Sequence, residues 1–318
     1  MGARELSIVL FLCVLLVAVG VTSPAFLHPA NIQDILVNSS FTVVAAVGMT
    51  MVIVAGGIDI SIGSMLAVCC VVAGNAAKAG LPTALVLLLS LAVGLVLGSI
   101  NGALVAFARI PSIIVTLGTM SIMRGAVTWA TGGYWVRDLP PSFTALGASE
   151  FLGVPMSVWV AGVVAVVGAF VMRGTRVGRR IYAVGGNPRA AELAGINVRW
   201  VVFGVFAACG ALVGIAAILY ATRFTVIQSN AGVGFELLVI TAVVVGGTNI
   251  MGGRGTVFGS VLGVLLLSVI GSALTYKHVS AYWESAVQGV LVLLAVVSDT
   301  LRPSRAAKPG FSLFWRSP

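Results

Sequence analysis

Residues 85–97 read LVLLLSLAVGLVL and carry no charged side chain. Apolar side chains fill this run continuously, whereas a membrane β-strand would alternate apolar and polar residues. Runs of this kind recur along the chain, which is 59% hydrophobic and only 8% charged. A soluble protein of 318 residues could not cover so much apolar surface with polar side chains. The fold class that we predict is therefore an all-α polytopic membrane protein.

The number of spans follows from length and hydropathy. A membrane-spanning helix needs roughly 20 mostly apolar residues, so this chain has room for about ten of them. Their predicted positions are residues 7–21, 39–55, 58–77, 81–107, 112–130, 156–172, 200–221, 235–247, 256–275 and 282–297. The first run resembles the core of a signal peptide, but Ser23-Pro24-Ala25 is a poor cleavage site, so we predict an uncleaved span. Residues 1–318 are predicted to form a single transmembrane domain.

The distribution of basic residues predicts the orientation of these spans. With the N-terminus inside, 13 of the 18 Lys and Arg residues fall in inner segments and 4 in outer segments, and Arg124 lies within a span. Basic residues concentrate in cytoplasmic loops of membrane proteins. We therefore predict that both termini are cytoplasmic, with residues 302–318 as a basic tail. The same bias accounts for the net charge of +9 without a nucleic-acid partner.

Enzyme chemistry is not indicated by the sequence. The two histidines, His28 and His278, lie in separate predicted outer loops, and no G-x-x-x-x-G-K-[ST] phosphate-binding loop is present. The four cysteines fall inside apolar runs without a C-x-x-C pair, which is typical of small buried hydrophobic residues; they are Cys13, Cys69, Cys70 and Cys209. We expect no catalytic residue, no metal site and no cofactor on this chain.

Two glycines interrupt an apolar run in residues 49–64, MTMVIVAGGIDISIGS. Irregular backbone at membrane depth is tolerated only inside protein or along a wet cavity. One interpretation is a broken helix that lines a translocation pathway and presents oxygens of Asp59 and Ser61. The other is a tight cytoplasmic turn in which Asp59 caps the next helix. The sequence favours the cap and leaves the pathway open.

A similar phrase returns at residues 245–256, VGGTNIMGGRGT, so that residues 56–59 can be laid over residues 246–249. Two structurally repeated halves are common in transporters. The overlay makes Thr248 and Asn249 further candidates for the pathway. Chance similarity between glycine turns is the alternative.

Few polar residues lie within the predicted spans, and Asn101, Thr116 and Arg124 are the pathway candidates among them. A charge at the bilayer centre costs about 2.5–3.5 kcal/mol on insertion scales, which makes Arg124 a functional candidate. A structural ion pair or a clamp on backbone carbonyls is the alternative. Glu236 falls at the start of a predicted helix, where we interpret it as a cap or an interface anchor.

The most polar segment is residues 173–199, RGTRVGRRIYAVGGNPRAAELAGINVR, which holds six of the 18 Lys and Arg residues and one acid. It contains a short helix-forming core, residues 188–193, that ends at Ala194-Gly195. We predict a cytoplasmic loop through which a soluble partner moves the membrane domain. The longest outer segment, residues 131–155, could cap the outer mouth or receive another soluble partner.

Four ordered motifs together resemble the permease subunit of bacterial ABC importers for monosaccharides, the ribose, xylose, arabinose, galactose, rhamnose and autoinducer-2 group. The resemblance covers roughly residues 7–300 and rests on GMTMVIVAGGIDISIGS at 48–64, NGALVAFARIPSIIVTLGTMSIMRG at 101–125, GRRIYAVGGNPRAAELAGINV at 178–198 and VVVGGTNIMGGRGTVFGSVLG at 243–263. Ile60 and Ile62 stand where this family more usually has Leu and Val.

This resemblance implies an inner-membrane permease that works as a pair with a second copy or a paralogue. It also implies a cytoplasmic ABC ATPase, which would hold ATP and Mg, and a periplasmic sugar-binding protein. The segment similar to the family's coupling segment is residues 187–197, with implied ATPase contacts at Arg189, Ala190, Ala191, Glu192 and Gly195. The sugar is not identified by the sequence.

Two other classes of function compete with this one. An ion-coupled secondary transporter would explain Asp59, Arg124 and Glu236 as relay groups but would leave the polar loop without a role. A membrane enzyme or a structural protein would need a catalytic or assembly signature that the sequence does not show.

Overall fold

The computed structural model describes residues 3–224, 226–277, 279 and 282–300. Within these residues the structure is helical, apart from one small hairpin of strands β1 (Glu150–Phe151) and β2 (Val154–Pro155). The predicted basic tail at 302–318 and His278 lie outside the described residues. The prediction of an all-α fold is confirmed.

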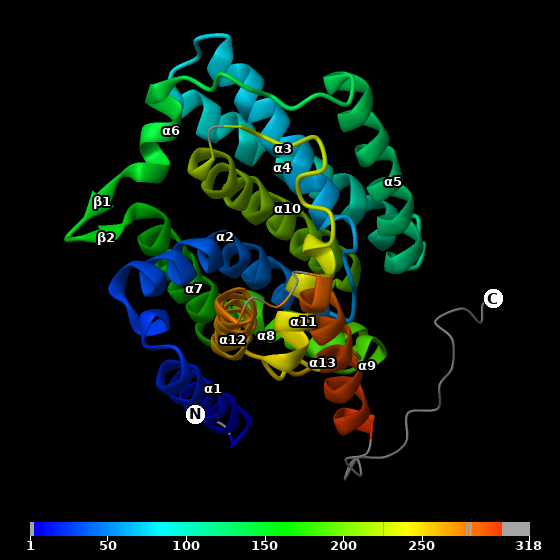
Figure 1. The fold of residues 1–318 in the computed structure, drawn as a ribbon. Helices are drawn as coiled ribbons and strands as arrows, with labels where there is room; N and C mark the ends of the chain where they lie inside the picture. Colours follow the sequence, from blue (N-terminus) through cyan, green and yellow to red (C-terminus); the bar gives the residue numbers. More distant parts are fainter. Residues whose placement is uncertain (1–2, 225, 278, 280–281, 301–318) are drawn as a thin grey trace.

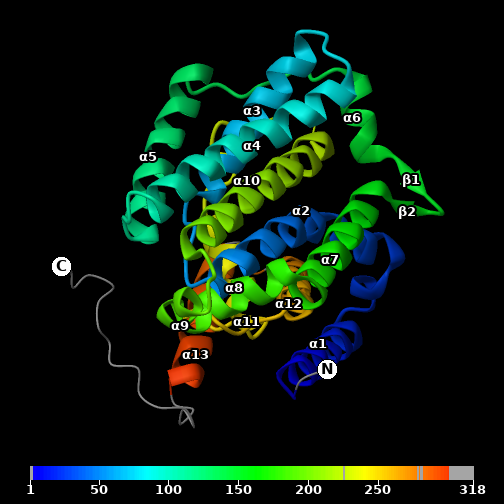
Figure 2. The ribbon, with the colours of Figure 1, turned by 180° about the vertical axis from the view of Figure 1, so that it is seen from behind.

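The helices follow one another without further strands in the described residues (Figures 1 and 2). They are α1 (Ala3–Thr22), the 3-10 helix η1 (Pro24–Leu27), α2 (Pro29–Val54), α3 (Ile62–Lys78), α4 (Thr83–Ala106), α5 (Ser112–Thr131), α6 (Pro141–Ala148), α7 (Met156–Gly174), α8 (Arg176–Gly186), α9 (Pro188–Leu193), α10 (Val198–Arg223), α11 (Phe235–Val245), α12 (Val257–Tyr276) and α13 (Tyr282–Thr300).

Each predicted span coincides with one of these helices. Among the described residues, seven helices are long and apolar enough to cross a membrane, and the apolar helices α3 and α11 are shorter. The largest error is at α2, which begins ten residues before the predicted start at residue 39. Polar side chains lower the hydropathy of that first part, but the protein satisfies them internally. The buried Asn31 amide donates to the Phe26 carbonyl at 2.7 Å and accepts from the Ser272 hydroxyl at 3.1 Å.

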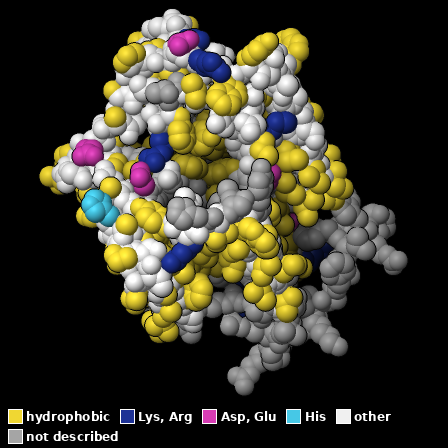
Figure 3. Space-filling model, viewed as in Figure 1, with side chains coloured by type: hydrophobic (Ala, Val, Ile, Leu, Met, Phe, Trp, Pro, Cys, Tyr) yellow, Lys and Arg dark blue, Asp and Glu magenta, His cyan; other side chains and the backbone are white. Residues whose placement is uncertain are grey.

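Helix α2 lies at the centre of the molecule and is buried along most of its length. It packs against α7, α10 and α12, while α10 packs on α3 and α4 (Figures 1 and 2). The outer helices α1, α4, α5 and α7 each expose a row of large apolar side chains. Figure 3 shows hydrophobic side chains spread over the periphery, with charged side chains scattered among them. Such a surface suits a lipid solvent and not water.

Glycine allows α4 and α10 to approach until their backbones touch. A Cβ atom built on Gly98 would lie 2.9 Å from the Gly210 Cα, and one on Gly94 would collide with the Gly210 carbonyl oxygen. In lipid, helix association depends on close van der Waals packing because the lipid tails are themselves apolar. The small residues of these two helices are therefore part of what holds the core together.

Replacing Gly210 with alanine should destabilise this packing. The added methyl group would lie 2.8 Å from the Gly98 Cα and overlap the Gly94 carbonyl, so the helices must separate. Overpacking of this kind costs about 1–3 kcal/mol. We expect a lower apparent melting temperature of the purified chain in detergent. The matched control is Gly204→Ala on the same helix, where a Cβ meets nothing within 4 Å. Equal melting temperatures for the two variants would contradict the prediction.

Candidate coupling and translocation sites

The predicted coupling core forms a separate short helix, α9, over the residues expected from the sequence. Its N-terminus is capped by Asn187, whose side-chain oxygen accepts from the Ala190 amide at 3.0 Å. Its C-terminus is closed by Gly195 at φ +78°, with the Gly195 amide on the Glu192 carbonyl and the Ile196 amide on the Ala191 carbonyl. This glycine closure is a common helix end, since glycine adopts positive φ without steric cost.

The side chains of α9 divide between the protein body and the surface. Ala191 is 3% exposed and holds the helix against the body. The other implied contacts, Arg189, Ala190, Glu192 and Gly195, are exposed. Leu193 is 84% exposed, although the sequence analysis did not single it out. Leu193 could have been identified from the sequence, because it is an apolar residue inside the most polar segment of the chain. A helix end with an exposed leucine and open glycine offers a surface for another protein.

Glycines from three distant parts of the chain meet beside the end of α8, and we call Gly56, Gly185, Gly186, Gly252 and Gly253 the glycine junction. The Gly253 amide donates to the Val54 carbonyl at 2.9 Å. A Cβ on Gly185 would collide with that same carbonyl oxygen, and a Cβ on Gly252 would lie 3.0 Å from the Gly56 Cα. The segment that leads into α9 is thus in backbone contact with the α2–α3 turn and the α11–α12 turn.

A side-chain hydrogen bond reinforces this contact. The hydroxyl of Tyr182 on α8 donates to the Gly255 carbonyl at 2.7 Å. Burial raises the pKa of the Tyr182 phenol above its ordinary value, and nearby Arg173 only partly opposes this effect. The phenol therefore stays protonated at neutral pH and remains a donor.

The two glycine turns are alike, but their structural match differs by one residue from the match in sequence. Gly56 at φ +88° follows the C-cap residue of α2, and Gly247 at φ +96° follows that of α11. In each turn the amide of the next residue donates to a carbonyl near the end of the helix. The Gly57 amide donates to the Val52 carbonyl, and the Thr248 amide donates to the Val243 carbonyl. Aligned by these closures, Gly56 matches Gly247 and not Gly246. The predicted repeat is therefore present as local geometry, but its helix closures are shifted by one residue from the match in sequence.

Each turn is then closed by a side chain that accepts from the amide two residues later. Asp59 accepts from the Ser61 amide at 2.9 Å, and Asn249 accepts from the Met251 amide at 2.8 Å. Asp and Asn side chains commonly form such turns. Asp59 thus closes a turn, as one interpretation expected, but its partner is the residue preceding α3 and not an amide of the first helical turn. Thr248 is fully buried beside this second turn, and its hydroxyl has no hydrogen-bond partner.

Three of the pathway candidates join in a buried polar cluster. The Ser61 hydroxyl donates to Asp59 Oδ1 at 2.6 Å, and the Asn101 amide of α4 donates to the Ser61 hydroxyl at 2.8 Å. Thr116 is also buried beside the turn, but its hydroxyl bonds to the Ser112 carbonyl of its own helix at 2.8 Å. The second carboxylate oxygen of Asp59 and the Asn101 carbonyl oxygen have no hydrogen-bond partner. The cluster locks the turn to α4.

Replacing Asp59 with alanine should loosen this cluster. The buried amide and hydroxyl of Ser61 would lose their shared acceptor, and an unsatisfied buried donor costs about 1–3 kcal/mol. We expect a lower apparent melting temperature in detergent. Asp59→Asn is the matched control, because its carboxamide oxygen can still accept from Ser61. The prediction fails if the alanine and asparagine variants melt at the same temperature.

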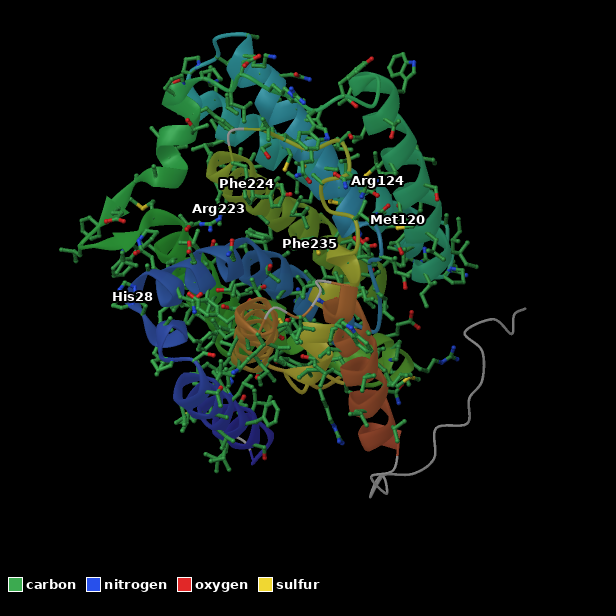
Figure 4. The ribbon with its side chains drawn as sticks, viewed as in Figure 1. His28, Met120, Arg124, Arg223, Phe224 and Phe235 are labelled. Carbon is green, nitrogen blue, oxygen red and sulfur yellow. The ribbon has the colours of Figure 1, made fainter. Side chains whose placement is uncertain are left out.

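Arg124 does not join this cluster. Its guanidinium donates to the Ala231 carbonyl at 2.8 Å, which is the carbonyl clamp that one interpretation expected. The remaining donors border a cavity of about 730 Å³ between α3, α5 and α11, lined by Ser64, Met120, Ser121, Arg124, Trp129 and Glu236 among others. Figure 4 shows Arg124 and Met120 on the side of α5 that faces α3. The sequence indicates Arg124 as a candidate but does not show that Ser64 lies beside it.

The predicted outer segment at 131–155 packs against the end of α10. It forms α6 and the hairpin, and the Val136 and Ile227 backbones pair with one another at 2.9 Å. A second cavity, of about 530 Å³, lies between α6 and the end of α10. Arg223 borders it and pairs with Asp34 at 3.2 Å (Figure 4). The segment thus covers this end of the bundle.

Comparison with known proteins places the chain in a family. Residues 31–296 match the family model described as branched-chain amino acid transport system / permease component. The chain is 37% identical over 292 residues to the ribose import permease protein of Haemophilus influenzae, covering 91% of this chain and 90% of that one. The ribose import permease protein of Escherichia coli K12 is also 37% identical, covering 91% of each chain.

A third relative is the autoinducer 2 import system permease protein of Salmonella typhi, 33% identical over 296 residues, 93% of this chain and 85% of that one. No solved structure matches the chain. The family match spans most of the described helices, and these relatives are transport components and not enzymes. The chain therefore belongs to this family of multi-pass inner-membrane permease components.

Proposed function

We propose that the chain is the membrane-spanning subunit of an ATP-driven importer for a monosaccharide or a closely related polyol. The similarity to ribose and autoinducer-2 import permeases over nine-tenths of the chain carries this proposal. The buried polar groups support it, since hydroxyl, amide and carboxylate side chains can exchange hydrogen bonds with sugar hydroxyls. ATP and Mg belong to the partner in this proposal, and this chain supplies the passage.

Three partners complete the proposed assembly. A cytoplasmic ABC ATPase would dock on α9 at Arg189, Ala190, Glu192, Leu193 and Gly195, which the fold leaves exposed. A second permease, either a copy or a paralogue, would complete the passage. A periplasmic binding protein would deliver the sugar to the side that carries α6. The ion-coupled alternative gains no support, because Asp59 closes a turn and Arg124 clamps a carbonyl.

The coupling route that we propose runs from α9 through α8 to the glycine junction. Closure of the ATPase pair would displace α9, and α8 would carry that displacement to both turns as a rigid body. The backbones are in direct contact, so a displacement of α8 would be passed on to both turns. Glycines have no side chains whose rotamers could change to absorb that displacement. The α2–α3 and α11–α12 turns would then move together. This is a rigid-body switch between two states, biased by the higher affinity of ATP for one of them.

Reconstitution in lipid vesicles tests the proposed function. The chain is combined with the proposed ATPase and sugar-binding partners, and uptake of radiolabelled sugar is measured with and without ATP. We expect uptake that requires ATP and both partners. Uptake by the chain alone, driven by an ion gradient, would overturn the proposal in favour of a secondary transporter.

A further inference from the structure

We infer that the cavity between α3, α5 and α11 is a binding site for an uncharged polyhydroxylated solute, contacted by Ser64, Arg124 and Glu236. The identification of that solute as a transported sugar rests on the proposed function. The site itself is supported by two helix starts, a buried serine without a hydrogen-bond partner, a pair of opposite charges and the size of the cavity.

Two short helices begin at this cavity. Helix α3 has 17 residues and α11 has 11. At 1.5 Å per residue they reach only about 25 Å and 16 Å of a hydrocarbon core of about 30 Å. Their starts meet where the backbones of Gly63 and Gly232 touch, so that a Cβ on either residue would overlap the other's backbone oxygen. The amides of a first helical turn lack intrahelical partners, and two helix starts bring the positive ends of two helix dipoles to one place.

Ser64 in the first turn of α3 provides independent evidence for a ligand. It is 1% exposed and lines the cavity, and its hydroxyl oxygen has no hydrogen-bond partner. Most buried side-chain polar atoms in proteins have a partner, because leaving one unsatisfied costs free energy. A hydroxyl of a bound solute could supply the missing donor and accept the serine proton.

The charges at the cavity favour a neutral occupant. Arg124 on α5 still has N–H donors beyond the one on the Ala231 carbonyl. Glu236 in the first turn of α11 carries the opposite charge and is close enough to interact electrostatically with Arg124. The carboxylate accepts hydrogen bonds and the guanidinium donates them, whereas a sugar hydroxyl does both. The two charges cancel, so an anionic or cationic solute would leave one of them without compensation.

The volume of the cavity and the aromatic ring at its edge also suit a sugar. A cavity of about 730 Å³ lies within the range of small-molecule sites. The indole of Trp129 borders it and is 87% exposed, which leaves an aromatic face free to pack on the apolar C–H face of a sugar ring. The site therefore offers polar groups for hydroxyls at its base and an aromatic ring at its rim.

A labelling experiment tests the site without relying on transport. Ser121 is exposed and borders the cavity, so a cysteine there can report on its occupancy. Cys13, the exposed native cysteine among the described residues, is first replaced by serine. The full chain in lipid nanodiscs is then labelled with a small thiol reagent in the presence of ribose, xylose, galactose or glucuronate. We expect the neutral sugars to slow labelling of Ser121→Cys and glucuronate to have little effect.

Two variants and one control make the test specific. Ser64→Ala in this background should raise the sugar concentration needed for half-protection by about five- to tenfold, the effect of one hydrogen bond. Glu236→Gln should leave the Arg124 charge uncompensated and shift protection from neutral sugars toward glucuronate. The control is Ser157→Ala on α7, a buried serine whose hydroxyl is also unpartnered but which does not line the cavity. We expect it to leave protection unchanged.

The outcomes separate this inference from the proposed function. No protection by any neutral sugar, or equal protection in the Ser64→Ala and control variants, would overturn the site even if ATP-driven uptake is observed. Should Glu236→Gln fail to insert or fold, Ser64→Ala still decides the question. Protection without ATP-driven uptake would leave the site standing and refute the proposed function.

Discussion

Replacing Gly195 with tryptophan is expected to reduce ATP-driven sugar uptake by about tenfold to a hundredfold, since a bulky group at a packed contact costs about 1–3 kcal/mol. The residue lies at the exposed end of α9, and a Cβ built there meets nothing within 4 Å of the chain itself. A side chain at this position therefore projects into open space, where an indole would obstruct a protein that docks on this end. Uptake in vesicles and co-purification of the ATPase measure the effect.

The control for this variant must share its backbone strain. Gly195 has φ +78°, a conformation that is strained for alanine as it is for tryptophan, because both carry a Cβ atom. Gly195→Ala should therefore retain most of the uptake, while Gly195→Trp loses it with normal membrane insertion. Retention of uptake and ATPase binding by the tryptophan variant would show that α9 is not the docking surface.

The second large effect is expected for Gly185→Ala in the glycine junction. The added methyl group would overlap the Val54 carbonyl oxygen and lie 2.8 Å from the Gly253 amide nitrogen, where the backbones of two turns are hydrogen-bonded to each other. Relief requires α8 to move away from both turns. We expect a drop in stability of about 1–3 kcal/mol or more and loss of coupled uptake. Apparent melting temperature and sugar-stimulated ATP hydrolysis by the complex are the measurements.

The neighbouring residue supplies the control. A Cβ on Gly186 meets nothing within 4 Å, so Gly186→Ala changes the same helix end without a collision. We expect it to keep both the melting temperature and the stimulation of ATP hydrolysis. If the two alanine variants behave alike, the junction does not transmit motion from α9 to the turns.

The sequence was sufficient for features that depend on neighbouring residues. The spans could be predicted because lipid offers no hydrogen bonds, so each apolar segment must satisfy its own backbone as a helix. The short helix α9 could be predicted to the residue, since Pro188 fixes φ at its start and Gly195 permits the positive φ that closes its end. The orientation of the termini stays a prediction from the charge distribution.

The sequence was weaker where burial offsets polarity. The first ten residues of α2 were missed because hydropathy counts Asn31 as polar and ignores its partners Phe26 and Ser272. The repeat was recognised from its glycines, and Asp59 and Asn249 close equivalent turns in the predicted register, yet the glycines that close the two helices differ from that register by one residue. Local identity cannot show which glycine adopts the positive φ that closes each helix.

Two features were decided only by tertiary structure. The glycine junction brings together residues near 56, 185 and 253. The cavity places Ser64 and Glu236 beside Arg124, which the sequence had indicated only as a single charged residue within a span. Several of these residues stand out in their own segments, but no single segment shows which distant residues they contact. Local sequence specifies which segments become helices, because backbone hydrogen bonding in lipid is a local requirement. Which helices touch is specified by shape and by the pairing of distant polar groups, and these exist only once the chain has packed.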